Sequence, residues 1–480
     1  MNSLNLNTYF KSITQTQCIV LACSTLLLGI WSLPETIALR NITLIGGFLA
    51  SIFFLHQNKA EFLNYRAWPI YIFFGFFPWL IIHLLFLSHE FKEQFSELLS
   101  LWLRCSLASL IGLATGLILK KNYIESEEKD IKHIAQGLPL QKSGNVILIL
   151  LYMGLGGYAF ISLGYLIFQW CYLGQTFKLT PDMNTNLLYQ LYKAKIPFVI
   201  GGTFFFPLCF ILVIRSINCH KKIWASLGLL GIACGLFMAA FSNTRNGVAI
   251  FVFTLIIFIF NFLLRFKWSY QRIRFAASII GFTICLSFFG ITKHLEKNTS
   301  WRYLLANIEV GVNIDGEKFW RDRDAYLYAP LNRYGVPVDD STYDRAAWFT
   351  AGAQLLSENP LGFGLIKHSF GRLALSKWPD FYKPTMDFRG ATHSGWLDFA
   401  LGVGIPGLLL IWVPLFIFWY RSLRLKGLWF SYTSWTIPIM SLAYLISEAN
   451  GEHFIELLFF MVAFFGGITM NANSKTLGPE

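Results

Sequence analysis

The stretch GVAIFVFTLIIFIFNFLL, residues 247–264, runs without a single charged side chain. Its length approaches the roughly 20 apolar residues that an α-helix needs to cross the hydrocarbon core of a bilayer. Apolar runs of similar length recur on both sides of it along the chain. We therefore expect a lipid bilayer, rather than a water-soluble core, to decide the fold.

The composition of the whole chain agrees with this expectation. Its 480 residues are 55% hydrophobic and 17% aromatic, and only 14% of them are charged, whereas soluble globular domains contain about 25% charged residues. The net charge of +12 is explained by Lys and Arg in the loops of a membrane protein, so we expect no nucleic-acid partner. The eight cysteines lack the spacing of a metal site or a disulfide framework. The sequence predicts an all-α polytopic membrane protein.

The apolar runs predict about twelve transmembrane helices. We expect the first helix to stay uncleaved, because VLAC at 20–23 fits a lipoprotein cleavage site poorly. The predicted helices lie near residues 17–34, 42–56, 68–88, 98–119, 145–171, 196–215, 223–241, 247–265, 274–292, 395–420, 429–448 and 453–470.

Lys and Arg in the loops set the predicted orientation, because cytoplasmic loops carry an excess of both residues. The basic residues concentrate near residues 59–66, 120–142, 215–222, 265–274 and 421–426. If these loops are cytoplasmic, both termini are cytoplasmic too, and the long segment before the tenth helix lies outside. The predicted organisation is helices 1 to 9 in 1–292, an outer loop domain at 293–394, helices 10 to 12 in 395–470 and a cytoplasmic tail at 471–480.

The outer segment contains a predicted helix within DRAAWFTAGAQLLSENPLGFG, residues 344–364. Apolar residues recur there at helical spacing, and the Asn-Pro pair at 359–360 ends the helix, since the residue before proline avoids the helical region. With Thr342 or Asp344 as the N-cap, Arg345 falls in the first turn, where the helix dipole disfavours a cation. Arg345 then either binds an anion together with backbone N–H groups or forms a surface salt bridge.

A second arginine lies in the very short connection SNTRNG, residues 242–247. Arg245 must sit near the outer membrane boundary, where an ionisable side chain is a candidate for function. The alternative is that Arg245 extends toward lipid headgroups. Arg104, in the outer half of the fourth helix, raises the same question.

A histidine completes the candidate site. His393 ends the outer segment and begins the tenth helix, so the predicted topology puts it on the same side of the membrane as Arg245 and Arg345. Two guanidinium groups suit a diphosphate, and an imidazole can take up a proton near neutral pH. Gly404 and Gly407 follow in the helix and let a neighbouring helix or a lipid chain approach closely.

Three glutamates near the end of the chain are candidate supporting residues. Glu448, Glu452 and Glu456 are spaced four residues apart, which puts them on one helix face. They either orient His393, balance the arginines or form a solvated helix end.

These residues resemble a known signature. His393-Ser394, then nine residues, Gly404, two residues and Gly407 resembles the motif of the bacterial O-antigen ligase superfamily, in which a histidine followed by Asn, Ser or Gln precedes Gly-x-x-Gly. The helix with Arg345 and Trp348, which ends in Pro-Leu-Gly at 360–362, is also similar to that family. The chain departs from the family at Ala249, where a leucine often follows the first arginine by four residues.

The resemblance implies a metal-independent, inverting glycan transferase that needs no cofactor and lies in the bacterial inner membrane with a periplasmic active site. It implies a donor glycan on undecaprenyl diphosphate. Arg245 and Arg345 would bind the diphosphate, and His393 would activate the acceptor hydroxyl or stabilise charge. Ser394 is a possible supporting residue.

The acceptor is not determined by these motifs. We expect lipid A–core, as for an O-antigen ligase. The alternatives are a protein O-oligosaccharyltransferase that glycosylates Ser or Thr of a pilin or another periplasmic protein, and an O-antigen polymerase. A transporter is less favoured, because the chain lacks an evident set of intramembrane acidic residues or an inverted repeat.

Overall fold

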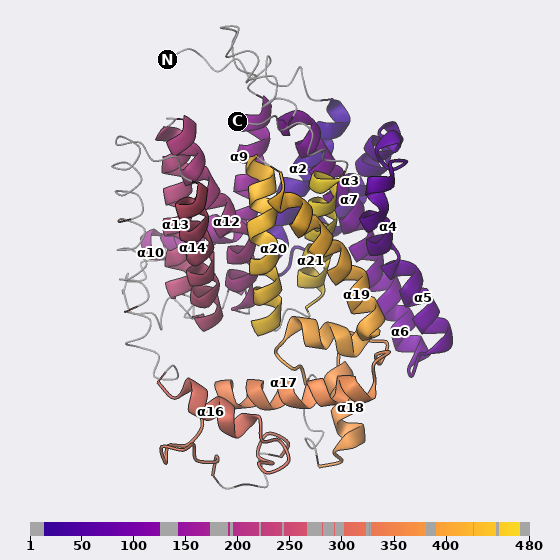
Figure 1. Cartoon of the computed structure of the whole chain (residues 1–480), viewed down its shortest axis with the longest axis vertical. Helices are drawn as coiled ribbons and strands as arrows, with labels where there is room; N and C mark the ends of the chain where they lie inside the picture. The colour runs from indigo at the N-terminus through magenta and orange to yellow at the C-terminus, as the bar shows by residue number, and fades with distance from the viewer. Residues whose placement is uncertain are drawn as a thin grey trace.

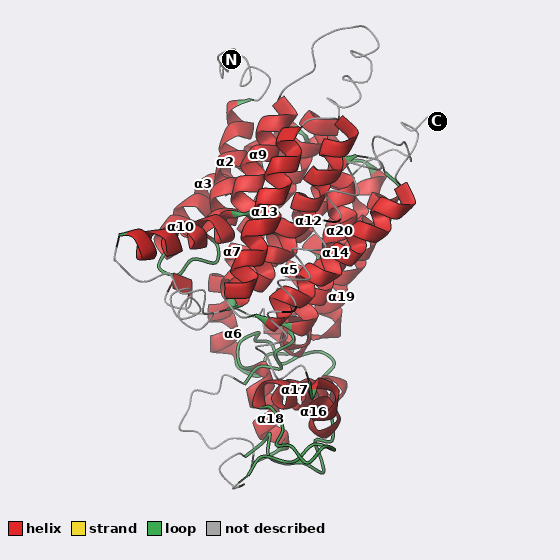
Figure 2. Cartoon of the chain, turned by 90° about the vertical axis from the view of Figure 1, so that its left-hand side faces the viewer, coloured by secondary structure: helices red, strands yellow, loops and turns green. Residues whose placement is uncertain are grey.

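The computed structural model of the chain (Figure 1) describes residues 14–124, 143–172, 191–192, 195–219, 222–241, 244–265, 281, 292, 302–322, 326, 328–380, 390–425, 427–447 and 451–470. Within these residues every regular element is a helix, apart from one isolated β-bridge between Leu331 and Pro337. Figure 2 shows the helices by colour. The predicted all-α fold is confirmed.

Five helices of the described part are long and apolar enough to cross a membrane, and a bent pair adds a sixth if its halves form one span. The five are Ile37–Gln57, Tyr65–Phe86, Phe91–Asn122, Ile196–Ser216 and Gly395–Leu423. Further helices run beside them, among them α2 (Gln15–Ile30), α13 (Lys222–Phe241), α14 (Arg245–Arg265), α20 (Leu428–Ile446) and α21 (Glu452–Thr469). The chain is therefore a helical membrane protein, and the number of twelve spans stays a prediction.

Predicted and observed helices agree closely, with one exception. The predicted span at 274–292 lies outside the described residues except for residues 281 and 292. The predicted span at 145–171 contains two helices, α9 (Ser143–Leu155) and α10 (Gly157–Cys171), which meet at a bend of 60°. A Cβ on Gly157 would lie 2.5 Å from the Cα of Gly29. This close backbone contact accompanies the bend, and an apolar run by itself carries no sign of it.

Two of the membrane helices pack through glycines. α7 (Leu103–Leu119) and α21 approach so closely that a Cβ on Gly116 would lie 3.0 Å from the Cα of Gly467. Small residues let helix backbones come together in a bilayer. This packing brings the first turn of α7, with Arg104, beside the first turns of α21.

A smaller helical unit lies at one end of the bundle. It consists of α16 (Leu304–Gly311), α17 (Asp340–Glu358) and α18 (Ser369–Lys377), and α17 lies across the ends of the membrane helices (Figure 1). The unit has a hydrophobic core of its own, which includes Trp320 and Tyr343. Leu401 of α19 (Gly395–Leu423) belongs to the same core, so α19 connects this unit to the membrane helices.

The helix α19 is broken at Gly404, which has φ 76° and ψ 171°. The break frees backbone groups, and the connection that follows α17 satisfies them. Three backbone hydrogen bonds of 2.7 to 2.8 Å join the two segments, from Phe363 to Leu401, from Gly364 to Gly402 and from Ile405 to Pro360. As predicted, α17 ends at the Asn-Pro pair, with Glu358 as its last residue and Asn359 in the C-cap position. Gly362 and Gly364, with φ of 84° and 104°, lie in the turn that follows.

Candidate functional site

His393 lies in the turn that leads into α19 and has a left-handed backbone with φ 56°. For an L residue this conformation costs roughly 1–2 kcal/mol, and it persists only where the surrounding structure holds it. The flanking residues Thr392 and Ser394 are both about 1% exposed. Asp398 accepts a hydrogen bond from the Thr392 amide at 2.7 Å and another from the Thr392 hydroxyl at 2.8 Å. The backbone on both sides of the histidine is therefore held in place.

The imidazole of His393 stacks on the indole of Trp348, with ring centroids 5.1 Å apart and planes 18° apart. Trp348 belongs to α17, the helix that also carries Arg345. The histidine predicted as the proton acceptor thus lies against the helix predicted to bind an anion.

Arg245 is the first residue of α14, and its side chain extends to the start of α17. One guanidinium nitrogen lies 3.5 Å from the Asp339 carboxylate and donates a hydrogen bond of 3.3 Å to the hydroxyl of Thr342. The other terminal nitrogen donates to the hydroxyl of Ser341. The side chain is 18% exposed. Arg245 therefore contacts the smaller helical unit, which argues against the alternative in which it extends to lipid headgroups.

Arg345 occupies a different helical position from the one predicted. α17 begins at Asp340 with Asp339 in the N-cap position, so the prediction of Thr342 or Asp344 as the cap was wrong. Arg345 lies in the second turn, and the effect of the helix dipole falls off beyond the first turn. Several Asp, Ser and Thr residues in succession are all suitable caps, which is why the sequence pattern misplaced the start.

One face of α17 nevertheless brings the three predicted residues together. Ser341, Arg345 and Trp348 follow one another at spacings of four and three residues, which places them on the same side of a helix. Ser341 contacts Arg245, and Trp348 contacts His393. Seven residues of α-helix span only about 10 Å. Arg345 therefore lies between the contact with Arg245 and the contact with His393.

The glycines of the motif have a specific structural explanation. A Cβ on Gly404 would collide with the carbonyl group of Leu361, and a Cβ on Gly407 would lie 3.1 Å from the indole nitrogen of Trp79. The close neighbour of Gly404 is thus the connection after α17 rather than a lipid chain or another helix. The glycine motif therefore lets the connection after α17, the helix that carries Arg345, dock at the break in α19, the helix that follows His393.

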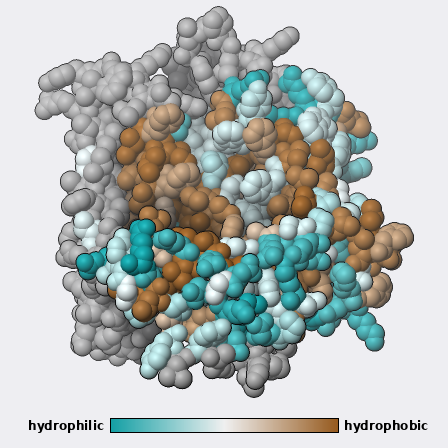
Figure 3. All heavy atoms as spheres, turned by 60° about the horizontal axis from the view of Figure 1, so that its bottom comes forward, coloured by the Kyte–Doolittle hydropathy of each residue, from teal (hydrophilic) through white to brown (hydrophobic). Residues whose placement is uncertain are grey.

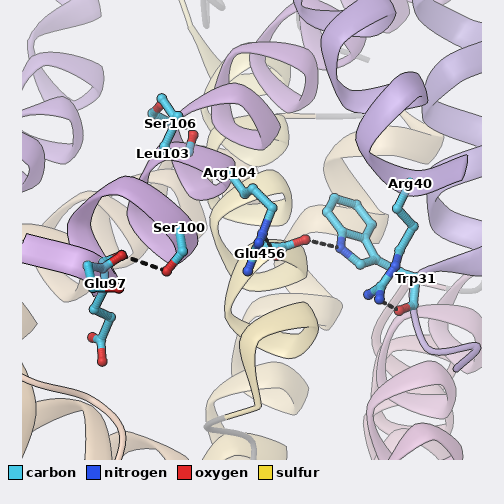
Figure 4. A network of polar contacts seen from close by, with 9 residues as sticks. Trp31, Arg40, Glu97, Ser100, Leu103, Arg104, Ser106 and Glu456 are labelled. Carbon is cyan, nitrogen blue, oxygen red and sulfur yellow. Dashed lines mark hydrogen bonds and ion pairs between the residues drawn. The ribbon is translucent and has the colours of Figure 1, made fainter. Parts of the chain in front are cut away.

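Arg104 and Glu456 form an ion pair of 2.6 Å (Figure 4). The second carboxylate oxygen of Glu456 accepts a hydrogen bond of 2.9 Å from the indole of Trp31. Glu456 therefore fits one of the three interpretations of the glutamates, the one in which they balance an arginine. The arginine that it balances is Arg104. Glu448 and the side chain of Glu452 lie outside the described residues.

Two further contacts at the site were not expected from the sequence. The side chain of Asn246 donates a hydrogen bond of 3.1 Å to the hydroxyl of Ser447. The backbone carbonyl of Ser447 accepts a hydrogen bond of 2.9 Å from the Gly395 amide. These bonds join the starts of α14 and α19 to the end of α20, and no sequence pattern indicates them. Asp398 was also missed, although a lone carboxylate in an otherwise apolar run is a recognisable signal.

The surface agrees with this arrangement. Figure 3 shows hydrophilic residues gathered at the end of the molecule where α16 to α18 lie, with hydrophobic residues on the helices behind them. The fold defines a helical membrane protein with a polar candidate site, which contains arginine and histidine, at one end of its helices.

Comparison with known proteins supports the resemblance seen in the motifs. Residues 229–412, which include Arg245, Arg345 and His393, match the family model described as O-Antigen ligase. This part of the chain is therefore similar to the O-antigen ligase superfamily, which agrees with the motifs. The match supports glycan transfer of the ligase or polymerase type, for which the family implies a lipid-linked glycan as the donor. No curated protein and no solved structure matches the chain.

Proposed function

We propose that the protein is an O-antigen ligase that transfers a glycan from undecaprenyl diphosphate to a hydroxyl group of lipid A–core. The observation that carries the proposal is the shared face of α17. Arg245 contacts its start, Arg345 follows one turn later, and Trp348 stacks on His393 one further turn along. A diphosphate bound by the two arginines would hold the attached sugar next to the imidazole.

In the proposed reaction, the acceptor oxygen forms a bond to the anomeric carbon of the donor sugar. The bond between this carbon and the phosphate oxygen breaks, and its electron pair stays on the diphosphate. The proton of the acceptor hydroxyl passes to a ring nitrogen of His393. Attack from the face opposite the diphosphate inverts the configuration of the anomeric carbon.

The two kinds of residue contribute in different ways. Negative charge grows on the diphosphate as its bond breaks, and guanidinium groups held in place stabilise it. A charge-assisted hydrogen bond to each arginine contributes roughly 1.5–3 kcal/mol. A positioned base such as His393 typically contributes about 10²–10⁴-fold to the rate. Because a diphosphate is already a good leaving group, the reaction needs neither a strong acid nor a metal ion.

The proposal includes the orientation in the membrane. The smaller unit with α16 to α18 would lie in the periplasm, within a loop domain of residues 293–394, between transmembrane helices in 1–292 and 395–470. Both termini, including the tail at 471–480, would be cytoplasmic. The enrichment of Lys and Arg in the alternate loops supports this orientation, and a lipid-linked donor would explain a site at the membrane boundary.

The direct test uses purified protein in proteoliposomes with a glycan on undecaprenyl diphosphate and lipid A–core as the acceptor. Wild-type protein should form glycosylated lipid A–core, and His393→Ala should lose the activity. His56→Ala serves as the matched control, because His56 is an exposed histidine in the last turn of the membrane helix Ile37–Gln57. Near-normal transfer by His393→Ala would refute the proposed mechanism.

The same reaction distinguishes the possible acceptors. A periplasmic pilin or a second lipid-linked glycan replaces lipid A–core in parallel reactions. Transfer to the pilin alone would make the protein an O-oligosaccharyltransferase, and elongation of the lipid-linked glycan alone would make it a polymerase.

A further inference from the structure

Asp398 is a buried carboxylate outside the set of residues that the motif identifies. It lies in the first turn of α19 and is 3% exposed. Burying a charged group is unfavourable unless hydrogen bonds satisfy it. One oxygen of Asp398 accepts two hydrogen bonds, and both come from Thr392, the residue before His393.

These bonds are part of a network around the histidine. The hydroxyl of Thr392 also accepts a hydrogen bond of 3.2 Å from the Ser394 amide, on the other side of His393. The carbonyl of Ser394 accepts one of 2.9 Å from the Asp398 amide. The residues before and after the histidine are therefore connected to one carboxylate, and His393 bridges them with its left-handed backbone.

The partner of Asp398 distinguishes this network from an ordinary helix cap. In a capping box, the side chain in the first turn accepts a bond from the amide of the N-cap residue itself. Ser394 is the N-cap residue of α19 and its side chain makes no capping bond. Asp398 instead accepts its bonds from Thr392, two residues before Ser394, so the network extends across His393.

We propose that Asp398 is a positioning residue for His393 and acts through Thr392. The inference rests on the proposed function, in which the imidazole takes the proton of the acceptor. The carboxylate holds the turn in the left-handed conformation, and this conformation directs the imidazole onto Trp348, one turn away from Arg345. Loss of the carboxylate would displace the imidazole from the acceptor without disturbing the arginines that bind the donor.

The kinetic test compares Asp398→Ala, Asp398→Asn and Thr392→Val with wild-type protein in the transfer reaction. We expect kcat to fall by about 100-fold, the effect of misplacing a catalytic group by about 1 Å, while KM for the lipid-linked donor stays within about twofold. Thr392→Ser keeps the hydroxyl and should recover most of the rate that Thr392→Val loses. Thr254→Val is the matched control, since Thr254 is an equally buried threonine within α14 that bonds only to the carbonyl of Ile250.

A second measurement does not depend on glycan transfer. Diethyl pyrocarbonate acylates accessible imidazole, and mass spectrometry of the peptide that contains His393 gives its rate of modification. We expect faster modification in Asp398→Ala and Thr392→Val than in wild type and Thr254→Val. If wild-type protein transferred no glycan, the proposed function would fail, but this rate would still report on the positioning of His393.

Two results would overturn the inference. One is a kcat within about twofold of wild type in both Asp398→Ala and Thr392→Val. The other is an unchanged rate of His393 modification in folded Thr392→Val protein, which removes the hydroxyl while keeping the carboxylate and the side-chain volume. Because Thr392→Val is the milder change, it decides the question if Asp398→Ala fails to fold.

Discussion

The ring of His393 stacks on the ring of Trp348 with centroids 5.1 Å apart, and the two residues come from the turn before α19 and from α17. The connection 360–364 attaches α17 to α19 at the break at Gly404, and His393 lies two residues before α19 begins. The stacked pair therefore depends on how this connection docks.

Removal of the stacking ring should slow transfer. Aromatic pairs contribute about 0.5–1.5 kcal/mol beyond their buried area, so Trp348→Ala should lower kcat by up to about tenfold, and Trp348→Phe should retain most of the rate. The initial rate of glycan transfer measures the effect. Trp419→Ala, at the opposite end of α19, serves as the control. Equal rates for Trp348→Ala and Trp348→Phe would show that the ring does not position the histidine.

Replacement of either arginine by lysine should impair the reaction, because lysine lacks the planar group that binds phosphate in a bidentate manner. Arg245→Ala and Arg345→Ala should lower kcat/KM for the donor by about 10²–10³-fold, the usual effect of removing one donor to a developing negative charge. The kcat/KM values of the lysine variants should lie between those of the alanine variants and that of wild type. Arg333→Lys is the control, since Arg333 is 55% exposed and pairs with Glu309. Full activity of Arg345→Ala would exclude it from diphosphate binding.

Gly404→Ala should destabilise the protein and lower activity. The alanine would adopt an unfavourable positive φ, and its Cβ would collide with Leu361. Gly335→Ala isolates the cost of the positive φ, because Gly335 also has a positive φ but has open space around it. Gly46→Ala, within a helix and with open space, should stabilise the protein by about 0.5–1 kcal/mol. Thermal unfolding in detergent ranks the stabilities of the three variants. A Gly404→Ala variant as stable as Gly335→Ala would contradict the inference that the connection after α17 packs against Gly404.

Glu456→Ala should reduce stability without changing the catalytic rate of the folded protein. Breaking a buried ion pair leaves an uncompensated charge, at a cost of about 3–5 kcal/mol; the cost here should be toward the lower end, because Arg104 is 24% exposed. Combining Glu456→Leu with Arg104→Met should restore much of the lost stability. Thermal unfolding and kcat per folded molecule test this. A fall in kcat at unchanged stability would instead implicate Glu456 in the reaction.

Transfer should proceed unchanged in the presence of a metal chelator. The proposed stabilisation of the diphosphate uses guanidinium groups, which need no ion. Activity is measured before and after EDTA treatment and again after addition of Mg²⁺. Loss on chelation and recovery with Mg²⁺ would assign the reaction to another class of transferase.

Much of this protein is determined by local features of the sequence. Apolar runs such as 247–264 have the length and composition that a bilayer requires, so the helices coincide with them. The Asn-Pro pair at 359–360 ends α17 because proline restricts the residue before it. The residue types and spacing of Arg345, His393 and Gly404 likewise indicated the family.

The tertiary structure alone decided which side chains meet. Arg245 contacts Ser341, and Arg104 contacts Glu456, across long stretches of chain with no shared periodicity. The bend at Gly156 and the break at Gly404 depend on the backbone that approaches them. Hydrophobic periodicity reports the environment of one segment, whereas a contact between segments depends on how both are packed. For this reason the sequence determined the helices and the chemistry of the candidate site, and the packing of α14, α17 and α19 decided its geometry.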